Sequence, residues 1–305
     1  MTSTCRHMDA GYIAMPPKAR QTLPPQNRES LTERLARLSP KRRETIRPVL
    51  ESPRTFVLLS VRDMAARLGS DPATIVRIAQ SMHFASYKEF QLYLHDLSIA
   101  NATSLDTMQA GPKDSSFTGS IRECLDNDMR NLNALRNSLD LARVGRLAQR
   151  VYAAKRIIVV GGDLAESLVQ YLHYHLLVLD LPVQIATTPG QAAYVTLNTA
   201  KTDLVFAISF RRGLRQTVEA MQRARRGGAY CVGITDTYLS PISQGADEFF
   251  LASVEAPSFA PSYVAPLALI NAILVACASY KRDRTLTLLR KVEQEQKHGF
   301  RWFDV

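Results

Sequence analysis

The stretch from Ser60 to Met82 limits the possible folds of this chain more than any other, because it has the spacing of two short helices joined by a tight turn. Its first half predicts a helix with one apolar stripe at i, i+3, i+4 and i+7, made of Val61, Met64, Ala65 and Leu68. Gly69 then suits the left-handed conformation of a turn, and Asp71 followed by Pro72 is a typical helix start. The whole pattern predicts a helix-turn-helix.

The second helix of this pattern has one apolar face and one polar face. Its apolar residues again recur at helical spacing, which predicts burial of Ile75, Ile78, Ala79 and Met82. The residues expected to face outward are Ala73, Thr74, Val76, Arg77, Gln80 and Ser81. Arginine and glutamine side chains can pair with two atoms of a base edge, so this face suits the major groove of DNA. An ordinary helical hairpin with a solvated face is the alternative for this stretch taken alone.

The residues that follow predict a third helix, since Ser86 and Glu89 have the spacing of a capping box. Tyr87 and Lys88 in its first turn are candidates for contact with the DNA backbone, and equally for plain core and surface positions. The full set of predicted DNA-binding residues is Ser60, Asp71, Ala73, Thr74, Arg77, Gln80, Ser81, Tyr87 and Lys88.

Size and charge agree with this prediction. The chain has 305 residues, enough for two domains with a core each, and a net charge of +10. Residues 30–95 contain eleven Lys or Arg against six Asp or Glu, whereas residues 113–305 contain twenty-three against eighteen. The basic surplus is therefore densest around the helix-turn-helix, as contact with phosphates requires.

Other features exclude several classes of protein. Four cysteines lie far apart with no histidine at ligand spacing, so we expect no metal, no cofactor and a reducing compartment. The N-terminal segment lacks the apolar region of a signal peptide, which favours a cytoplasmic protein. The apolar run Val264–Ala278 is shorter than a membrane span and contains Pro266 and Asn271. It is expected to be a buried core helix or an interface helix, and no membrane partner is expected.

The second half of the chain alternates apolar strands with helices. Its strands are expected at 156–160, 182–186, 204–208, 230–234 and 248–251. Continuous apolar strands of this kind indicate a parallel sheet with helices on both faces. Ligands of such sheets bind beyond the carboxyl ends of the strands, which here are Gly161–Ala165, Ser209–Gly213 and Thr235–Ser240.

The two halves together resemble the RpiR-type transcriptional regulators. The helix-turn-helix matches their form A-x-x-x-G-x-[SD]-x-A-T-x-x-R through Ala65, Gly69, Asp71, Ala73, Thr74 and Arg77, and the segment His83–Gln91 follows it. The second half is similar to their SIS (sugar isomerase) domain through Val160-Gly161, Asp203–Ser209, Gly233–Asp236, Ser240–Ile242 and Ala246-Asp247. The resemblance implies an all-α helix-turn-helix N-terminal domain plus an α/β SIS domain with a five-stranded parallel sheet and helices on both faces.

The resemblance and the composition together predict the division of the chain. The expected parts are a disordered tail at 1–28, the helix-turn-helix domain at 29–100, a linker at 101–116, the SIS domain at 117–285 and a C-terminal tail at 286–305. The resemblance further implies that the SIS domain serves as a sensor and mediates self-association.

In that family, the effector phosphate is held by a G-x-G-x-S turn and an S-x-S-G-x-T turn. Here Asp163 stands in place of the second glycine, and Arg211 and Arg212 replace most of the second turn after Ser209. The arginines attract an anion whereas Asp163 opposes one, unless Asp163 pairs with an arginine and closes an empty site. The predicted effector-binding residues are Gly161, Gly162, Asp163, Ser209, Arg211, Arg212, Thr235 and Ser240.

The favoured hypothesis is a regulator that binds a near-palindromic DNA operator as a dimer or tetramer and senses a small anionic metabolite, a sugar phosphate or related carbohydrate derivative. One alternative is a DNA-binding regulator whose SIS domain only oligomerises. A sugar-phosphate isomerase is the less favoured alternative, with Glu166, His173 and His175 as candidates for acid–base groups. An isomerase has no use for a helix-turn-helix, so we expect no catalytic residue.

Overall fold

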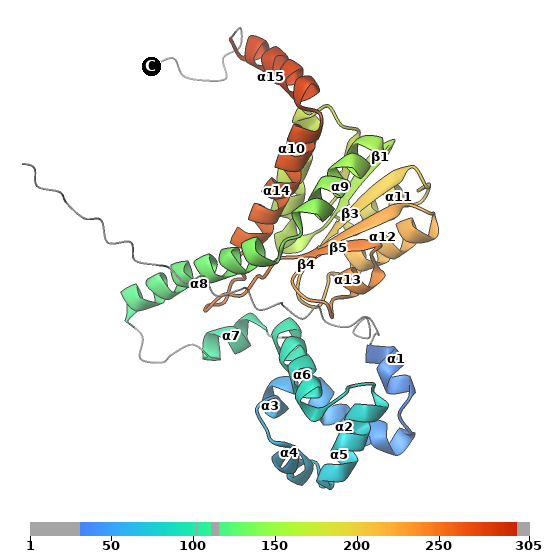
Figure 1. The fold of residues 1–305 in the computed structure, drawn as a ribbon, viewed down its shortest axis with the longest axis vertical. Helices are drawn as coiled ribbons and strands as arrows, with labels where there is room; N and C mark the ends of the chain where they lie inside the picture. The colour runs from blue at the N-terminus through green and yellow to red at the C-terminus, as the bar shows by residue number, and fades with distance from the viewer. Residues whose placement is uncertain (1–30, 102, 111–115, 298–305) are drawn as a thin grey trace, which may run out of the picture.

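The computed structural model describes residues 31–101, 103–110 and 116–297, and these residues form a helical module and an α/β domain. In Figure 1 the helical module lies below the α/β domain, and a short helix lies between them. The tail expected at 1–28 lies outside the described residues. The helical N-terminal part and the five-stranded sheet confirm the predicted fold class.

The helical module consists of six helices. They are α1 (Leu31–Ala36), α2 (Pro40–Glu51), α3 (Pro53–Phe56), α4 (Val61–Arg67), α5 (Pro72–Ser81) and α6 (Tyr87–Asn101). Its core joins the predicted apolar faces of α4 and α5 to an aromatic cluster on and before α6. Met64, Ala65, Ile75 and Ile78 are buried there, as the spacing predicts.

Local signals in the sequence set the ends of these helices. Asp71 Oδ1 accepts a hydrogen bond from Thr74 N at 2.8 Å and caps α5, and Ser60 Oγ accepts one from Asp63 N at 3.2 Å and caps α4. Between these helices Gly69 has φ +60°, the left-handed conformation that glycine adopts without strain. The helix-turn-helix is therefore built as the sequence predicts.

A buried arginine ties α1 to the end of α5, a contact that the sequence pattern does not indicate. Arg34 is 1% exposed. Its Nη1 donates to the Met82 carbonyl at 2.6 Å, and its guanidinium lies 4.4 Å from the centre of the Phe84 ring. This charged side chain therefore acts as part of the core, with its charge partly balanced by a carbonyl and an aromatic face.

We expect Arg34→Ala to lower the free energy of unfolding of the helical module by about 2–4 kcal/mol, because it removes a large buried side chain and leaves a buried carbonyl without its donor. Chemical denaturation followed by circular dichroism measures the effect. Arg62→Ala, at an exposed position of α4, is the matched control and should change stability by less than about 0.5 kcal/mol. Equal effects of the two changes would contradict the core role of Arg34.

The described part of the segment between the domains contains helical residues. α6 extends to Asn101, and α7 (Ser104–Ala110) lies within the expected linker at 101–116. Thr103 and Asp106 cap α7 reciprocally, since Asp106 N donates to Thr103 Oγ1 at 3.1 Å and Thr103 N donates to Asp106 Oδ2 at 2.9 Å. The linker expected at 101–116 therefore contains a capped helix, and the boundaries of the two domains stay a prediction.

The α/β domain contains five parallel strands. They are β1 (Arg156–Val160), β2 (Val183–Ala186), β3 (Asp203–Ile208), β4 (Tyr230–Thr235) and β5 (Glu248–Leu251), in the order β2-β1-β3-β4-β5. All five agree with the predicted strands to within one residue at each end. The order reverses direction between β1 and β3, so the carboxyl ends of these two neighbours border a topological switch point.

The described helices of the α/β domain are α8 (Phe117–Ser138), α9 (Leu141–Ala153), η2 (Asp163–Ala165), α10 (Glu166–Val178), α11 (Pro189–Val195), α12 (Arg215–Arg226), α13 (Pro241–Gly245), α14 (Val264–Tyr280) and α15 (Arg282–Lys297). Helices cover both faces of the sheet, while α8 and α15 pack against α14 and extend away from the sheet (Figure 1). Ile157 and Val159 of β1 face a core shared with α9, α10 and α14, whereas Ile158 and Val160 face α11, α12 and α13. Successive side chains of this fully buried strand thus point to opposite faces of the sheet, which lies as the middle layer between two layers of helices.

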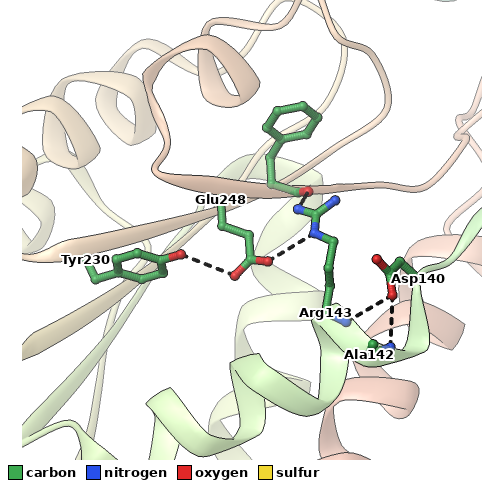
Figure 2. Close-up of polar contacts among 6 residues, drawn as sticks. Asp140, Ala142, Arg143, Tyr230 and Glu248 are labelled. Carbon is green, nitrogen blue, oxygen red and sulfur yellow. Dashed lines mark hydrogen bonds and ion pairs between the residues drawn. The ribbon is translucent and has the colours of Figure 1, made fainter. Parts of the chain in front are cut away.

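The edge strand β5 is tied to α9 by a polar cluster (Figure 2). Arg143 donates from Nε to Glu248 Oε1 at 3.1 Å and from Nη2 to the Phe249 carbonyl at 2.9 Å. Tyr230 donates to the other carboxylate oxygen of Glu248 at 3.4 Å. Asp140 caps the same helix through the N–H groups of Ala142 and Arg143. The bonds of Arg143 hold the N-terminal end of α9 against the sheet.

The C-terminal part of the chain contains two consecutive helices. The tail expected at 286–305 begins within α15, which ends at Lys297, and residues 298–305 lie outside the described part. α14 has seven of its residues in the core, which agrees with the core alternative for its apolar run. Among the described residues no single helix is long and apolar enough to cross a membrane, while α14 and α15 together pass by length and composition but are bent by 101°.

Candidate DNA interface and ligand pocket

The outward face of α5 contains exposed side chains suited to DNA. Ala73, Arg77 and Gln80 are exposed on this helix, opposite the buried Ile75 and Ile78. The spacing of three and four residues puts them on one side of the helix, where a major groove can receive them. Lys88, in the first turn of α6, is also exposed.

Other predicted DNA-binding residues serve the structure of the module. The Thr74 hydroxyl donates to Asp71 Oδ2 at 2.6 Å, and this bond keeps the pKa of the Asp71 carboxyl below its usual range. Tyr87 donates from its hydroxyl to the Leu59 carbonyl at 2.9 Å, and burial raises its pKa to about 12. Together with Ser60, these residues hold the ends of α4 and α5 in position.

A basic side chain from α2 reaches the end of α5, which sequence spacing does not reveal. Arg42 donates from Nη1 to Ser81 Oγ at 3.2 Å, and Ser81 donates to the carbonyl of Arg77 at 2.7 Å. The predicted residue Ser81 therefore lies beside a cation that a phosphate would also attract.

A pocket of about 370 Å³ lies beyond the carboxyl ends of β1 and β3, at the switch point of the sheet. Its lining comes from the turns that follow β1 and β3, from the start of α7 and from the segment before α14. The lining residues are Thr103, Ser104, Gly162, Asp163, Leu164, Ala165, Ser209, Phe210, Arg211, Arg212, Gly213, Leu214, Pro261 and Tyr263.

The turn after β3 directs most of its N–H groups into the protein. Arg211 N donates to Asp236 Oδ1 at 2.7 Å, and Leu214 N donates to Ser209 Oγ at 2.7 Å. Gly213 N donates to the Phe210 carbonyl at 3.2 Å. Arg211 and Gly213 both have positive φ, 57° and 76°, which produces this inward curl.

The turn after β1 combines a glycine that cannot be replaced with an unusual aspartate. A Cβ on Gly162 would lie 2.8 Å from the Thr187 carbonyl oxygen and 2.3 Å from Gln216 Nε2, so only glycine fits. Asp163 follows with φ 55°, a left-handed conformation that aspartate tolerates better than most residues. The sequence prediction that this turn departs from a glycine-rich form agrees with the geometry.

Tyr263 closes the pocket from the side of α14. Its ring lies 5.2 Å from that of Phe210. Burial raises its pKa to about 12, with the Asp163 charge acting in the same direction and Arg211 opposing it. The charges of Asp163 and Arg211 thus lie close enough to Tyr263 to affect its pKa, and the tyrosine hydroxyl is neutral at physiological pH.

The structure brings five of the eight predicted effector residues into the lining: Gly162, Asp163, Ser209, Arg211 and Arg212. Gly161 lies behind it, where a Cβ would meet Val169 and the Ile208 carbonyl. Thr235 is fully buried, and Ser240 caps α13 through Ile242 N at 3.2 Å.

Sequence reasoning missed Thr103, Ser104, Pro261 and Tyr263 in the lining, because only the tertiary fold brings these segments to the sheet. The T-x-x-D spacing of Thr103 and Asp106 is a signal for the cap of α7, but not for its place beside the sheet.

Two family models match the chain. A helix-turn-helix domain of the rpiR family matches residues 26–101, and a SIS domain matches residues 150–276. The matches and the fold define a class: DNA-binding transcriptional regulators in which a helix-turn-helix module precedes a SIS domain. The chain belongs to the RpiR family of these regulators.

Relatives and solved structures agree with this assignment. The HTH-type transcriptional regulator HexR of Escherichia coli is 26% identical over 209 residues, which are 68% of this chain and 71% of HexR. The sugar isomerase domain of an RpiR transcription factor from Sphaerobacter thermophilus is 27% identical with a TM-score of 0.55, covering 57% of this chain and 98% of that one. The Vibrio vulnificus NanR protein complexed with ManNAc-6P shares the fold at 21% identity and a TM-score of 0.56, covering 88% and 99% of the two chains.

Proposed function

We propose that this RpiR-type regulator senses a small anionic carbohydrate derivative in its SIS domain and adjusts its hold on DNA accordingly. The observation that supports the proposal most is the pocket lined by Arg211 and Arg212, which also includes Thr103 and Ser104 from the segment joining the domains. A ligand there would touch the connection to the helix-turn-helix directly. The regulator would act in the cytoplasm, where it meets its operator.

A second contact supports communication between the domains. The Asp236 carboxylate accepts the N–H of Arg211 from the pocket turn, and the loop that follows it brings Leu239 against the core of the helical module. Met108 of α7 also lies 3.8 Å, Sδ to Oγ, from Ser258 of the SIS domain. A change in the pocket turn would therefore reach the helix-turn-helix through packed side chains, as coupling between sites requires.

The test is a gel-shift or fluorescence titration of the full chain with operator DNA, with and without any metabolite that raises its melting temperature. A ligand that stabilises the protein should change its operator affinity by several-fold. If no anionic sugar derivative stabilises the protein, the alternative of a SIS domain that only oligomerises is favoured.

The isomerase alternative finds little support in the pocket. Its candidate acid–base residues Glu166, His173 and His175 all lie on α10 and do not belong to the described lining. His175 bonds through Nδ1 to the Tyr171 carbonyl at 2.9 Å, a helical contact within its own turn. We therefore propose binding without turnover, and release of an isomerised sugar phosphate by the purified protein would contradict it.

Self-association of the SIS domain is proposed to use an exposed apolar stripe on α8. Phe117, Ile121, Leu125 and Met129 follow at four-residue intervals, and each is at least half exposed. Such a contiguous row is unusual for a surface that meets only water. The run 264–278, considered as an interface helix from sequence, is mostly packed inside the domain.

We expect the double change Ile121→Glu and Leu125→Glu to convert the oligomer to monomer, because two charges would be buried in the interface without partners. Size-exclusion chromatography with light scattering measures the mass. Ala134→Glu adds a charge at an exposed position of the same helix, on the side away from the stripe, and should leave the mass unchanged. An unaltered oligomer in the double variant would mean that another surface joins the subunits.

A further inference from the structure

For binding an anion, the pocket has charged side chains, whereas few of its backbone N–H groups are available as donors. Three of the four N–H groups between Arg211 and Leu214 already donate to acceptors within the protein. A phosphate bound by a glycine-rich turn needs such N–H groups directed toward it. The hydroxyls of the S-x-S-G-x-T form are also absent after Ser209. Recognition of an anion would therefore depend chiefly on Arg211 and Arg212 of the lining, whose guanidinium groups can pair through two N–H donors with a carboxylate as with a phosphate.

The charge of the lining favours a monoanion. Its charged side chains are Arg211, Arg212 and Asp163, so the formal sum is +1. A phosphate monoester carries about −1.5 to −2 charges at pH 7, whereas a carboxylate carries one. Asp236 adds a further carboxylate directly behind the turn, 2.7 Å from Arg211 N. A dianion would meet two nearby acidic groups, while a monoanion is matched by the lining.

The remaining polar groups suit a polyhydroxylated molecule. Asp163 can accept hydrogen bonds from sugar hydroxyls, and Ser104 and Tyr263 are hydroxyl-bearing residues of the same lining. The Thr103 hydroxyl donates to Asp106 Oδ2 at 2.6 Å in the cap of α7. The volume of about 370 Å³ lies in the range of small-molecule sites, which is roughly 300–1,000 Å³. The pocket is therefore large enough for a molecule of the size of one sugar unit.

We infer that the ligand of this pocket is a sugar acid, a polyhydroxylated carboxylate such as an aldonate or uronate, and not a sugar phosphate. This inference rests on the proposed sensing function. The carboxylate pairs with the guanidinium groups of Arg211 and Arg212, and the hydroxyls of the ligand donate to Asp163.

Isothermal titration calorimetry of the full chain tests the inference with D-gluconate, D-galactonate, D-glucuronate, glucose 6-phosphate, ribose 5-phosphate and inorganic phosphate. At least one sugar acid should bind with a Kd about tenfold or more below that of every phosphate compound. Tighter binding of a sugar phosphate would overturn the inference while supporting the sensing function. Binding of none of the six would overturn both.

The variant Asp163→Asn tests the effect of the charge of the lining, because asparagine has nearly the same shape as aspartate. Asp163→Asn retains a side chain that tolerates φ 55° and raises the formal charge of the lining from +1 to +2. We expect the ratio of the sugar-acid Kd to the sugar-phosphate Kd to shift toward phosphate by about tenfold. Asp283→Asn, on exposed α15 outside the lining, makes the same change of charge and should leave the ratio unaltered. An equal ratio in wild type and Asp163→Asn would overturn the role of Asp163.

Discussion

Arg77→Ala is expected to weaken operator binding by about 1–3 kcal/mol and to relax sequence preference at one base position in each half-site. Arg77 is exposed near the middle of α5, between Ala73 and Gln80 on the same face. A guanidinium there can bond to two atoms of a guanine edge, and alanine removes both bonds. Fluorescence anisotropy with the operator and with single-base variants measures the change.

Lys88→Ala is the matched comparison, because Lys88 is also exposed and cationic but lies at the start of α6. It should weaken binding to all sequences alike and reduce the slope of log K against log salt by about one. If Arg77→Ala behaved in the same uniform way, α5 would not be the helix that reads the bases.

The second large effect is expected in the SIS domain, where Asp203→Ala should lower the free energy of unfolding by about 3 kcal/mol. Asp203 is 6% exposed at the start of β3, and its Oδ2 accepts from Arg156 Nη2 at 2.5 Å and from Ala200 N at 2.9 Å. Its loss leaves the Ala200 amide without its acceptor, and leaves the partly buried guanidinium with the Asn198 carbonyl but no carboxylate. The expected value lies at the low end of the range for buried pairs because the Arg156 side chain is 27% exposed.

A surface pair provides the control for this prediction. Arg47 and Glu51 on α2 form an ion pair at 2.7 Å, but both side chains are about 60% exposed. Glu51→Ala should therefore change stability by less than about 1 kcal/mol. Urea unfolding of both variants gives the comparison, and similar losses would show that burial does not set the strength of the Arg156–Asp203 pair.

Sequence reasoning predicted those features that depend on neighbours in the chain. The cap at Asp71, the left-handed Gly69 and the apolar strands each have a short-range cause, so their positions follow from spacing alone. One local signal is outweighed by packing: a proline inside a helix usually ends or kinks it, yet α2 continues past Pro48 to Glu51, with Ile46 and Val49 buried on either side of the proline. Packing thus offsets the loss of one helical hydrogen bond.

The candidate site was predicted only in part, because sequence patterns report on residues that are close together in the chain. The two turns at the ends of β1 and β3 follow from the alternation of strands and helices, and both line the pocket. Tyr263 and Thr103 enter the lining from segments that are distant in the sequence from both turns, and no local pattern places them there. The burial of Arg34 was not predictable for the same reason. A basic residue on a short helix is expected to be exposed, and only the tertiary fold brings the Met82 carbonyl and the Phe84 ring to it.

The packing of Leu239 against the helical module has a consequence for how the chain unfolds. A side chain that belongs to one domain and packs against the core of the other makes the unfolding of the two domains less independent. We expect calorimetry of the full chain to show overlapping transitions, and Leu239→Ser to separate them by lowering the melting temperature of the helical module. The helix-turn-helix domain and the SIS domain would then form part of one cooperative unfolding unit. Destabilising either domain would therefore also lower the stability of the other.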